Sequence, residues 1–218
     1  MSELAIFGSG VVGHATGMGL LHLGHSVTFV DIDEDRLAAL RGRSLTALHK
    51  DEMDLDGVDA VFVSVPTPST ADGIDLSYLD EACKALGASL QAIDHDPLIV
   101  FRSTMPPGTT RNRLIPNLEE ASGRKVGQGF EVSVNPEYLR EVNADHDFLN
   151  LSYVTVGTYA PDDEAARRMR TTSDGRAPPC NSHPHGYFSP VKNSSHCLRG
   201  LGTSFAAIGA AEVESVQL

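Results

Sequence analysis

The sequence predicts an α/β domain with a doubly wound, mostly parallel sheet. Over positions 1–170, short apolar runs alternate with amphipathic segments of helical spacing. Such runs are typical of strands buried on both faces, and their alternation with helices is typical of βαβ units. A glycine-rich turn joins the first run to the first helix, and polar loops follow several later runs. Ligands of doubly wound sheets bind beyond the carboxyl ends of the strands, so these loops are the candidate binding segments.

The first half of the chain supplies three of the predicted strands. Residues 4–7 form an apolar run that ends at Gly8, and residues 27–30 form a second run that ends at Asp31. Between them, residues 11–23 have helical spacing, with Gly24 as a stop signal. Residues 34–40 are predicted to be helical and residues 42–57 irregular. Residues 60–65 form a third strand, closed by a proline-rich turn.

The second half repeats this pattern. Helices are predicted at 76–90 and 109–118, and strands at 98–101, 130–134 and 153–157. Thr109 or Thr110 is expected to cap the second of these helices, because threonine is a common N-cap residue. A last helix is predicted to start at Pro161, since proline suits the first helical position and the acidic residues 162–164 suit the first turn.

The overall charge excludes several classes of partner. The formal net charge is −12 and 41% of the residues are hydrophobic, so the chain can bury a core but has no basic excess. Neither nucleic acid nor an anionic membrane is therefore expected as a partner. No apolar run is long enough to cross a bilayer and no signal peptide is visible, so we expect a cytoplasmic protein. The three cysteines do not indicate a disulfide framework.

The turn after the first strand has the pattern Gly-x-Gly-x-x-Gly. It follows a strand, opens a helix and precedes Asp31 at the end of the second strand, which is the context of a Rossmann dinucleotide-binding fingerprint. Its N–H groups and the helix dipole suit a diphosphate. Asp31 would accept hydrogen bonds from the adenosine ribose and repel a 2′-phosphate, which favours NAD over NADP. The alternative is a glycine turn in a similar fold that binds another ligand. The cofactor-binding residues predicted from this motif are Gly8, Gly10, Val11, Val12, Gly13 and Asp31.

Three further loops carry polar residues but are ambiguous when taken singly. Residues 63–68, Val-Ser-Val-Pro-Thr-Pro, have the pattern of a rigid loop that stops a strand. Residues 101–110 contain hydroxyl groups and two adjacent prolines, which helix capping also explains. Residues 135–141, Asn-Pro-Glu-Tyr-Leu-Arg-Glu, place Glu137 and Glu141 on one face if the segment is helical. A solvated acidic face has the same pattern.

Together, the four motifs resemble the NAD-binding half of the UDP-glucose/GDP-mannose 6-dehydrogenase family over residues 1–170. The resemblance implies NAD as cofactor, a nucleotide sugar as substrate, and oxidation of its C6 hydroxyl to the acid. It also implies that full-length relatives are homodimers. Asp31 and Arg36 would hold the adenosine ribose, and the cofactor contacts implied elsewhere are Pro66, Thr67, Ser103, Thr104 and Glu141. Glu137, which would handle protons, and Thr104 would be catalytic. The substrate would contact Glu137, Tyr138 and Leu139.

Two alternatives remain open at this point. A different Rossmann dehydrogenase, of the 3-hydroxyacyl or 6-phosphogluconate type, would share residues 1–31 but not the Asn-Pro-Glu motif. A non-enzymatic NAD-binding module would suit a chain without the family's catalytic half. The chain also departs from the family pattern at Met105 and Val142, and its segment between Arg41 and Val58 is shorter than usual.

Residues 171–218 have a different composition. They hold only six charged side chains but two of the three cysteines, and they have no sustained apolar period. The family's Gly-Gly-x-Cys loop and the lysine and asparagine of its catalytic helix are not present, so we expect an inactive NAD-binding fragment. The tail is expected to be poorly structured, either disordered or the product of a reading-frame change; a genuine short variant with an interaction tail is the alternative. No metal is expected, because no usual zinc spacing fits Cys180, His183, His185, His196 and Cys197.

Overall fold

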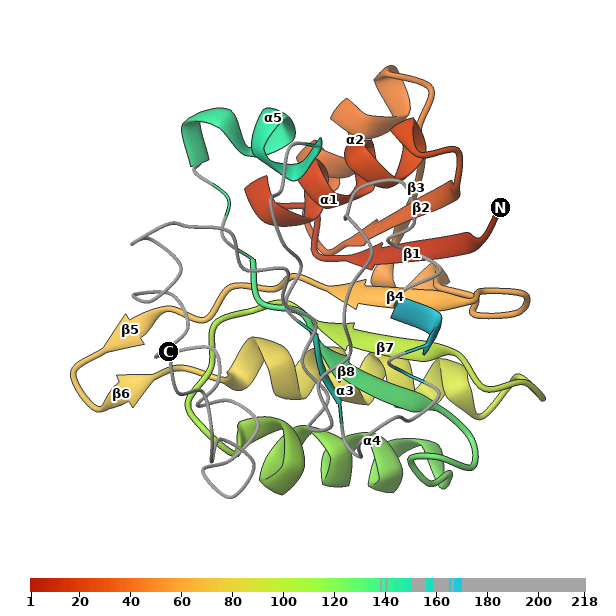
Figure 1. Ribbon diagram of the computed structural model, residues 1–218, viewed down its shortest axis with the longest axis vertical. Helices are drawn as coiled ribbons and strands as arrows, with labels where there is room; N and C mark the ends of the chain where they lie inside the picture. Colours follow the sequence, from red (N-terminus) through yellow and green to blue (C-terminus); the bar gives the residue numbers. More distant parts are fainter. Residues whose placement is uncertain (138, 140, 150–155, 159–164, 166, 170–218) are drawn as a thin grey trace.

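The protein is described from a computed structural model, which covers residues 1–137, 139, 141–149, 156–158, 165 and 167–169. A seven-stranded sheet of order β3-β2-β1-β4-β7-β8-β9 forms its centre (Figure 1). The first six strands in this order are parallel, and β9 is antiparallel to β8. The predicted doubly wound, mostly parallel sheet is therefore confirmed. The strands are β1 (Glu3–Phe7), β2 (Ser26–Asp31), β3 (Thr46–His49), β4 (Ala60–Val63), β7 (Leu98–Phe101), β8 (Glu131–Val134) and β9 (Gly157–Thr158).

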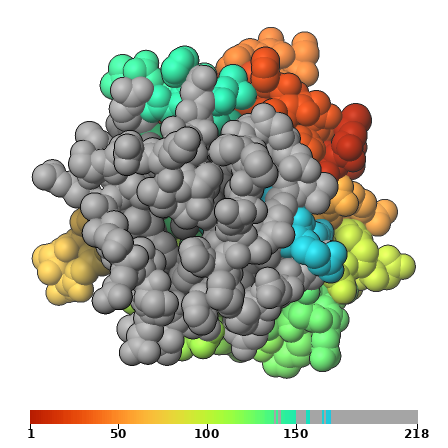
Figure 2. Space-filling model, viewed as in Figure 1, coloured from red at the N-terminus to blue at the C-terminus, as the bar shows by residue number. Residues whose placement is uncertain are grey.

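Helices cover both faces of this sheet. One face is covered by α1 (Val11–His22), α2 (Glu34–Gly42) and α5 (Ala144–Leu149), and the other by α3 (Ser77–Leu90) and α4 (Ile115–Ser122) (Figure 1). In β1, Leu4 and Ile6 pack toward the first group, whereas Ala5 and Phe7 pack toward the second. Both faces are thus buried, which explains why the strands read as continuous apolar runs. The space-filling view shows α5 beside the N-terminal part of the chain (Figure 2).

The prediction that residues 42–57 are irregular is wrong. β3 pairs in parallel with β2, and a 3-10 turn, η1 (Lys50–Glu52), follows it. β3 is the edge strand of the sheet, and Ala47 is its one buried residue. An edge strand of this kind has no apolar run, so the periodicity of the sequence could not reveal it.

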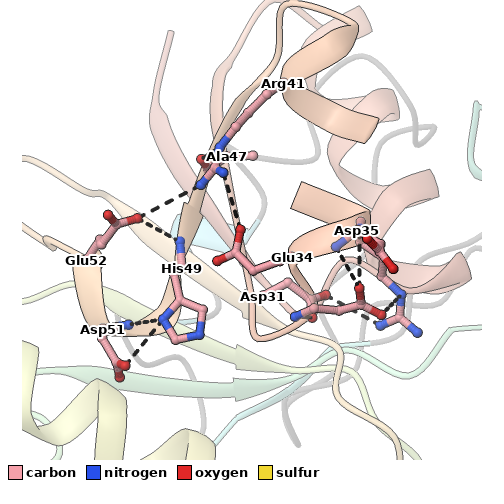
Figure 3. A network of polar contacts seen from close by, with 10 residues as sticks. Asp31, Glu34, Asp35, Arg41, Ala47, His49, Asp51 and Glu52 are labelled. Atoms are coloured by element: carbon pink, nitrogen blue, oxygen red, sulfur yellow. Dashed lines mark hydrogen bonds and ion pairs between the residues drawn. The ribbon is translucent and has the colours of Figure 1, made fainter. Parts of the chain in front are cut away.

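Polar contacts fasten this edge to α2 (Figure 3). The Arg41 side chain donates from Nε to the carbonyl of Ala47 at 2.9 Å. Its two terminal nitrogens lie 3.5 Å from Glu34 and 3.9 Å from Glu52. The backbone N–H of His49 donates to Glu52 at 3.1 Å. These contacts supplement the backbone pairing of β3 with β2, because β3 buries only the small side chain of Ala47.

The segment after β7 also differs from the prediction. A π-helical turn, η2 (Thr110–Leu114), precedes α4, which ends at Gly123 in a left-handed conformation. Thr109 makes no side-chain capping bond, because its own backbone is helical rather than extended. The Thr110 hydroxyl instead donates to the sulfur of Met105 at 3.4 Å. Thr109 thus stands at the predicted N-cap position, but the expected capping hydrogen bond from its side chain is not formed.

Short elements were missed, and the last predicted ones are only partly described. A hairpin of β5 (Ser69–Thr70) and β6 (Gly73–Ile74) follows β4, and a 3-10 turn, η3 (Glu141–Asn143), leads into α5. The strand predicted at 153–157 falls mainly outside the described residues, as does the helix start at Pro161; residues 165 and 167–169 are helical. Residues 171–218 lie outside the described residues altogether. Within the described ranges, no helix has both the length and the apolar character needed to cross a membrane.

Candidate functional site at the carboxyl edge of the sheet

Four polar loops meet at one edge because the strands that precede them are parallel and in register. The last ladder pairs of β1, β4, β7 and β8 lie at the same level. One residue further on, Ser64, Arg102 and Asn135 each donate a backbone N–H to the last residue of the neighbouring strand, at 2.8–2.9 Å. The four sequence motifs therefore leave the sheet side by side.

The glycine turn leaves space for a ligand at one of its three glycines. Gly8 has a φ of 93°, and a Cβ there would lie 2.7 Å from the carbonyl oxygen of Ser64. A Cβ at Gly13 would overlap the carbonyl oxygen of Gly8. A Cβ at Gly10, in contrast, would meet nothing within 4 Å. The fold itself thus requires Gly8 and Gly13, whereas open space adjoins Gly10.

The N-terminus of α1 is also free of competing side chains. Gly10 is its N-cap and makes no side-chain capping bond, and the first turn contains no acidic residue. Val11, which begins the helix, is 54% exposed, and Val12 is half-buried. Exposed N–H groups at the positive end of a helix dipole, next to a residue without a side chain, fit the diphosphate of a dinucleotide.

Asp31 fastens the glycine turn to the end of β2. The residue is 5% exposed. Its Oδ2 accepts hydrogen bonds from the N–H and the hydroxyl of Ser9, both at 2.6 Å. Its Oδ1 accepts from the N–H groups of Ile32 at 2.8 Å and Asp33 at 3.0 Å. Burial alone would raise the pKa of Asp31, but these hydrogen bonds outweigh it and hold the pKa below its ordinary value. The sequence predicted a ribose contact here and missed this bracing role.

Arg36 stands beside Asp31 at the start of α2. Its Nη1 lies 3.6 Å from Asp31 Oδ2, and its Nε lies 3.4 Å from a carboxylate oxygen of Asp33. Asp33 caps α2 by accepting the N–H groups of Asp35 at 3.0 Å and Arg36 at 3.2 Å. The Arg36 side chain is 51% exposed, so it can reach a bound ligand.

A cavity of about 330 Å³ opens between the glycine turn, the end of β2, the end of β4 and the start of α3. It brings together five of the predicted cofactor residues, namely Gly8, Gly10, Asp31, Arg36 and Pro66. Lys50, Tyr78 and Glu81 line the same cavity and were not predicted from the sequence. These residues come from η1 and α3, and their places depend on how those elements pack, so no local motif could have indicated them.

A second cavity, of about 620 Å³, lies over the N-terminus of α1. Residues 9–11 and Arg36 form one side, and residues 142–146 form the other. α5 packs closely on α1 here, at a position where α1 has no side chain: a Cβ at Gly19 would overlap the ring of Phe148. The His14 ring accepts a hydrogen bond from Arg43 at 2.8 Å and lies 3.8 Å from Asp145. The two cavities share Gly10 and Arg36.

The loops after β4 and β7 are tied to each other. The Ser103 hydroxyl donates to the carbonyl of Val65 at 2.6 Å. Thr104 and Pro66 are exposed and Thr67 is half-buried. The structure therefore brings Ser103 next to the loop of Pro66 and Thr67, and it leaves the Thr104 side chain accessible at the edge.

Glu137 lies in an irregular loop rather than on a helix. Its Oε2 accepts the backbone N–H of Leu139 at 2.6 Å, and the residue is half-buried. Residues 135–137 and 139 are not helical, and η3 begins only at Glu141. The conditional helical face of Glu137 and Glu141 is therefore not formed. Leu139 packs against the core on the α1 side of the sheet. Tyr138 and the Glu141 side chain lie outside the described residues.

In the described part of the chain, no group of three or more His, Cys, Asp or Glu residues could hold a metal ion. The histidines and cysteines of the tail lie beyond that part. Cys83 is buried in α3, and its burial raises the pKa of the thiol to about 12. It faces the core rather than the edge of the sheet.

Known proteins are similar to this chain in sequence and in fold. The sequence profile described as the UDP-glucose/GDP-mannose dehydrogenase family, NAD binding domain, matches residues 39–171. UDP-glucose 6-dehydrogenase of Haloferax volcanii is 40% identical over 175 residues, covering 71% of this chain and 40% of that protein. GDP-mannose 6-dehydrogenase of Azotobacter vinelandii is 36% identical over 175 residues, with the same coverages of 71% and 40%. The chain thus spans about 40% of the length of these curated relatives.

Solved structures agree with the sequence comparison. A ternary complex of GDP-mannose dehydrogenase from Pseudomonas aeruginosa superposes with a TM-score of 0.72 and 28% identity, covering 80% of this chain and 45% of that chain. UDP-glucose dehydrogenase from Pyrobaculum islandicum gives a TM-score of 0.71 and 30% identity, covering 81% and 44%.

Proposed function

The chain belongs to the UDP-glucose/GDP-mannose dehydrogenase family, and we propose that it serves the NAD-dependent oxidation of the C6 hydroxyl of a nucleotide sugar to the acid. It carries the NAD-binding domain of this family, and NAD is its cofactor. The observation that carries the proposal is the register of the sheet, which places the glycine turn and the loops of Ser64, Arg102 and Asn135 along one edge.

The glycine turn and α1 would hold the cofactor. The N–H groups after Gly10 would bind the diphosphate, where an added side chain would meet no other part of the chain. Asp31 and Arg36 would hold the adenosine ribose beside the smaller cavity. The four hydrogen bonds that Asp31 accepts from the chain fill about four acceptor positions of its carboxylate. A ribose hydroxyl would therefore bind Asp31 by replacing the hydroxyl of Ser9. The negative charge of Asp31 would repel the 2′-phosphate of NADP.

The loops after β4, β7 and β8 would hold the reacting ends of cofactor and substrate. Bound NAD supplies the acceptor for the hydride that leaves C6. We assign the C6 hydroxyl proton to Glu137 Oε1, since Oε2 already accepts the Leu139 N–H. Thr104, which is exposed at the end of β7, would assist by hydrogen bonding to the substrate oxygen. Pro66, Thr67 and Ser103 would line the nicotinamide. Glu141 would contact the cofactor, and Tyr138 and Leu139 the sugar nucleotide.

We further propose that this chain alone does not complete the oxidation to the acid. None of its cysteines, Cys83, Cys180 and Cys197, stands in a Gly-Gly-x-Cys sequence. Without that thiol, the second oxidation lacks the nucleophile that the family resemblance implies.

The test is an absorbance assay for NADH with the full chain, NAD, and either UDP-glucose or GDP-mannose. We expect no NADH progress curve with either sugar, because the sequence also has no Lys-x-x-x-Asn pattern to supply the lysine and asparagine of the family's catalytic helix. Two variants sharpen the result, namely Glu137→Gln and the control Glu120→Gln, which changes an exposed residue of α4. Turnover that Glu137→Gln abolishes and Glu120→Gln leaves intact would refute the proposed inactivity and support the role of Glu137. Turnover that survives in Glu137→Gln would refute that role.

A further inference from the structure

A row of residues crosses the edge of the sheet just beyond the last ladder pairs. Ser64, Arg102 and Asn135 occupy it on β4, β7 and β8 and are joined through backbone hydrogen bonds to the neighbouring strands. Because side chains alternate along a strand, these three point to the same face as Phe62 and Val100, which is the α1 face. The row thus runs from the glycine turn toward the loop of Glu137.

Arg102 is the charged member of this row, and it is buried. It is 6% exposed, and its Nη1 donates to Oδ1 of Asn135, two residues before Glu137. Burial lowers the pKa of Arg102 to about 10, and the nearby Glu137 carboxylate opposes this effect. The guanidinium therefore keeps its charge at neutral pH, and the Glu137 carboxylate favours that charge.

The row also holds polar atoms that lack a partner. Among the described residues, the buried side-chain atoms without a hydrogen-bond partner are Ser64 Oγ and Arg102 Nε, and they belong to neighbouring positions of the row. Buried donors are nearly always satisfied when their role is only to support the fold. Arg102 Nε is such a donor with the Glu137 carboxylate nearby, at the edge where ligands of such sheets bind, and this indicates a functional position.

The loop of Glu137 is held at two points. Asn135 is bound by Arg102, and the Glu137 carboxylate is bound by the N–H of Leu139. Pro136 lies between them and restricts the backbone. We propose that Arg102 is a positioning residue for Glu137: its guanidinium holds the loop of Asn135, Pro136 and Glu137 at the edge of the sheet and balances the charge of the carboxylate. The inference rests on the proposed function only for the chemical role of Glu137.

The Leu139 amide gives a direct readout of this arrangement, because its proton is held by Glu137. Its resonance and its hydrogen exchange can be followed by NMR in the full chain, without substrate or turnover. In Arg102→Met, which keeps the bulk but removes the charge, we expect protection of the Leu139 amide to fall by about tenfold or more. Arg102→Lys should recover most of it. The control Arg113→Met, which breaks an exposed ion pair with Asp80, should leave it unchanged.

A second pair of variants covers the case in which Arg102→Met does not fold. Asn135→Leu removes the acceptor for Arg102 and should lower Leu139 protection, whereas Asn135→Asp keeps an acceptor and should retain it. Unchanged protection in Arg102→Met or Asn135→Leu would overturn the proposal, as would a loss in Arg102→Lys equal to that in Arg102→Met. Affinity for NAD, measured for the parent and for the control Arg113→Met, should agree within about threefold. Absence of NAD binding in the parent would count against the proposed function and not against this inference.

Discussion

Two buried charged residues at the carboxyl edge differ in how completely their polar atoms are hydrogen-bonded. Asp31 accepts four hydrogen bonds from the chain, whereas Arg102 leaves its Nε without a partner in the described part. The position of Asp31 at the end of the second strand was predictable, because the glycine motif sets the context. The burial of Arg102 was not predictable, since it depends on how β4, β7 and β8 come together. Because Asp31 accepts four hydrogen bonds from its own chain, we expect it to contribute to the stability of the fold as well as to ligand binding.

Asp31 should therefore make stability depend on pH. Its pKa in the folded protein lies below its ordinary value, so its contribution is present above the pKa of the unfolded chain, about 3.9, and is lost as pH falls below that value. Replacing it in Asp31→Asn should lower the free energy of unfolding at pH 7 by roughly 2 kcal/mol, because charge-assisted hydrogen bonds are weakened. Urea unfolding from pH 7 to pH 3 should show the difference from the parent shrinking with acidity. An equal difference at both ends would contradict this role.

At the scale of elements, packing on both faces decided what the sequence could predict. β1, β2, β4, β7 and β8 are buried strands, and their apolar runs predicted all five. β3 and α5 were not predicted, because neither contains an apolar run or a sustained apolar period. β3 pairs with β2 at the edge of the sheet and is further held by contacts of Arg41 and Glu52. α5 is a short segment fixed by Phe148 against Gly19. Contacts between distant segments leave no local period in the sequence.

The close approach of α1 to the sheet yields a matched pair of variants. A Cβ at Gly17 would overlap the buried ring of Phe29, whereas a Cβ at Gly42 in α2 would meet nothing within 4 Å. Gly17→Ala should therefore destabilise the fold by about 1–3 kcal/mol, the usual cost of overpacking. Gly42→Ala should be neutral or stabilise it by up to about 1 kcal/mol, because alanine favours the helix. Equal denaturant midpoints for the two variants would show that α1 does not pack as described.

At the scale of the whole molecule, the candidate site extends along the sheet edge from the end of β2 to the loop after β8. Sequence motifs predicted the loops that form it, because each motif directly follows or precedes a strand. They did not predict the contribution of Lys50, Tyr78 and Glu81, which lie on elements that reach the cavity only through the tertiary fold. Gly10 of the glycine turn lines both cavities, so a ligand bound to this turn would adjoin each of them.

The placement of the cofactor on the glycine turn is tested most directly by calorimetric titration of NAD and NADP into the full chain and into Gly10→Val. The parent should bind NAD more tightly than NADP, because Asp31 repels a 2′-phosphate. Gly10→Val should remain folded and lose only about 1 kcal/mol of stability through the less favourable N-cap residue, since the position faces open space. It should nevertheless lose NAD affinity by at least about tenfold, or 1.4 kcal/mol. Equal affinities of the parent for the two cofactors, or undiminished NAD binding in a folded Gly10→Val, would contradict the placement of the cofactor on the glycine turn.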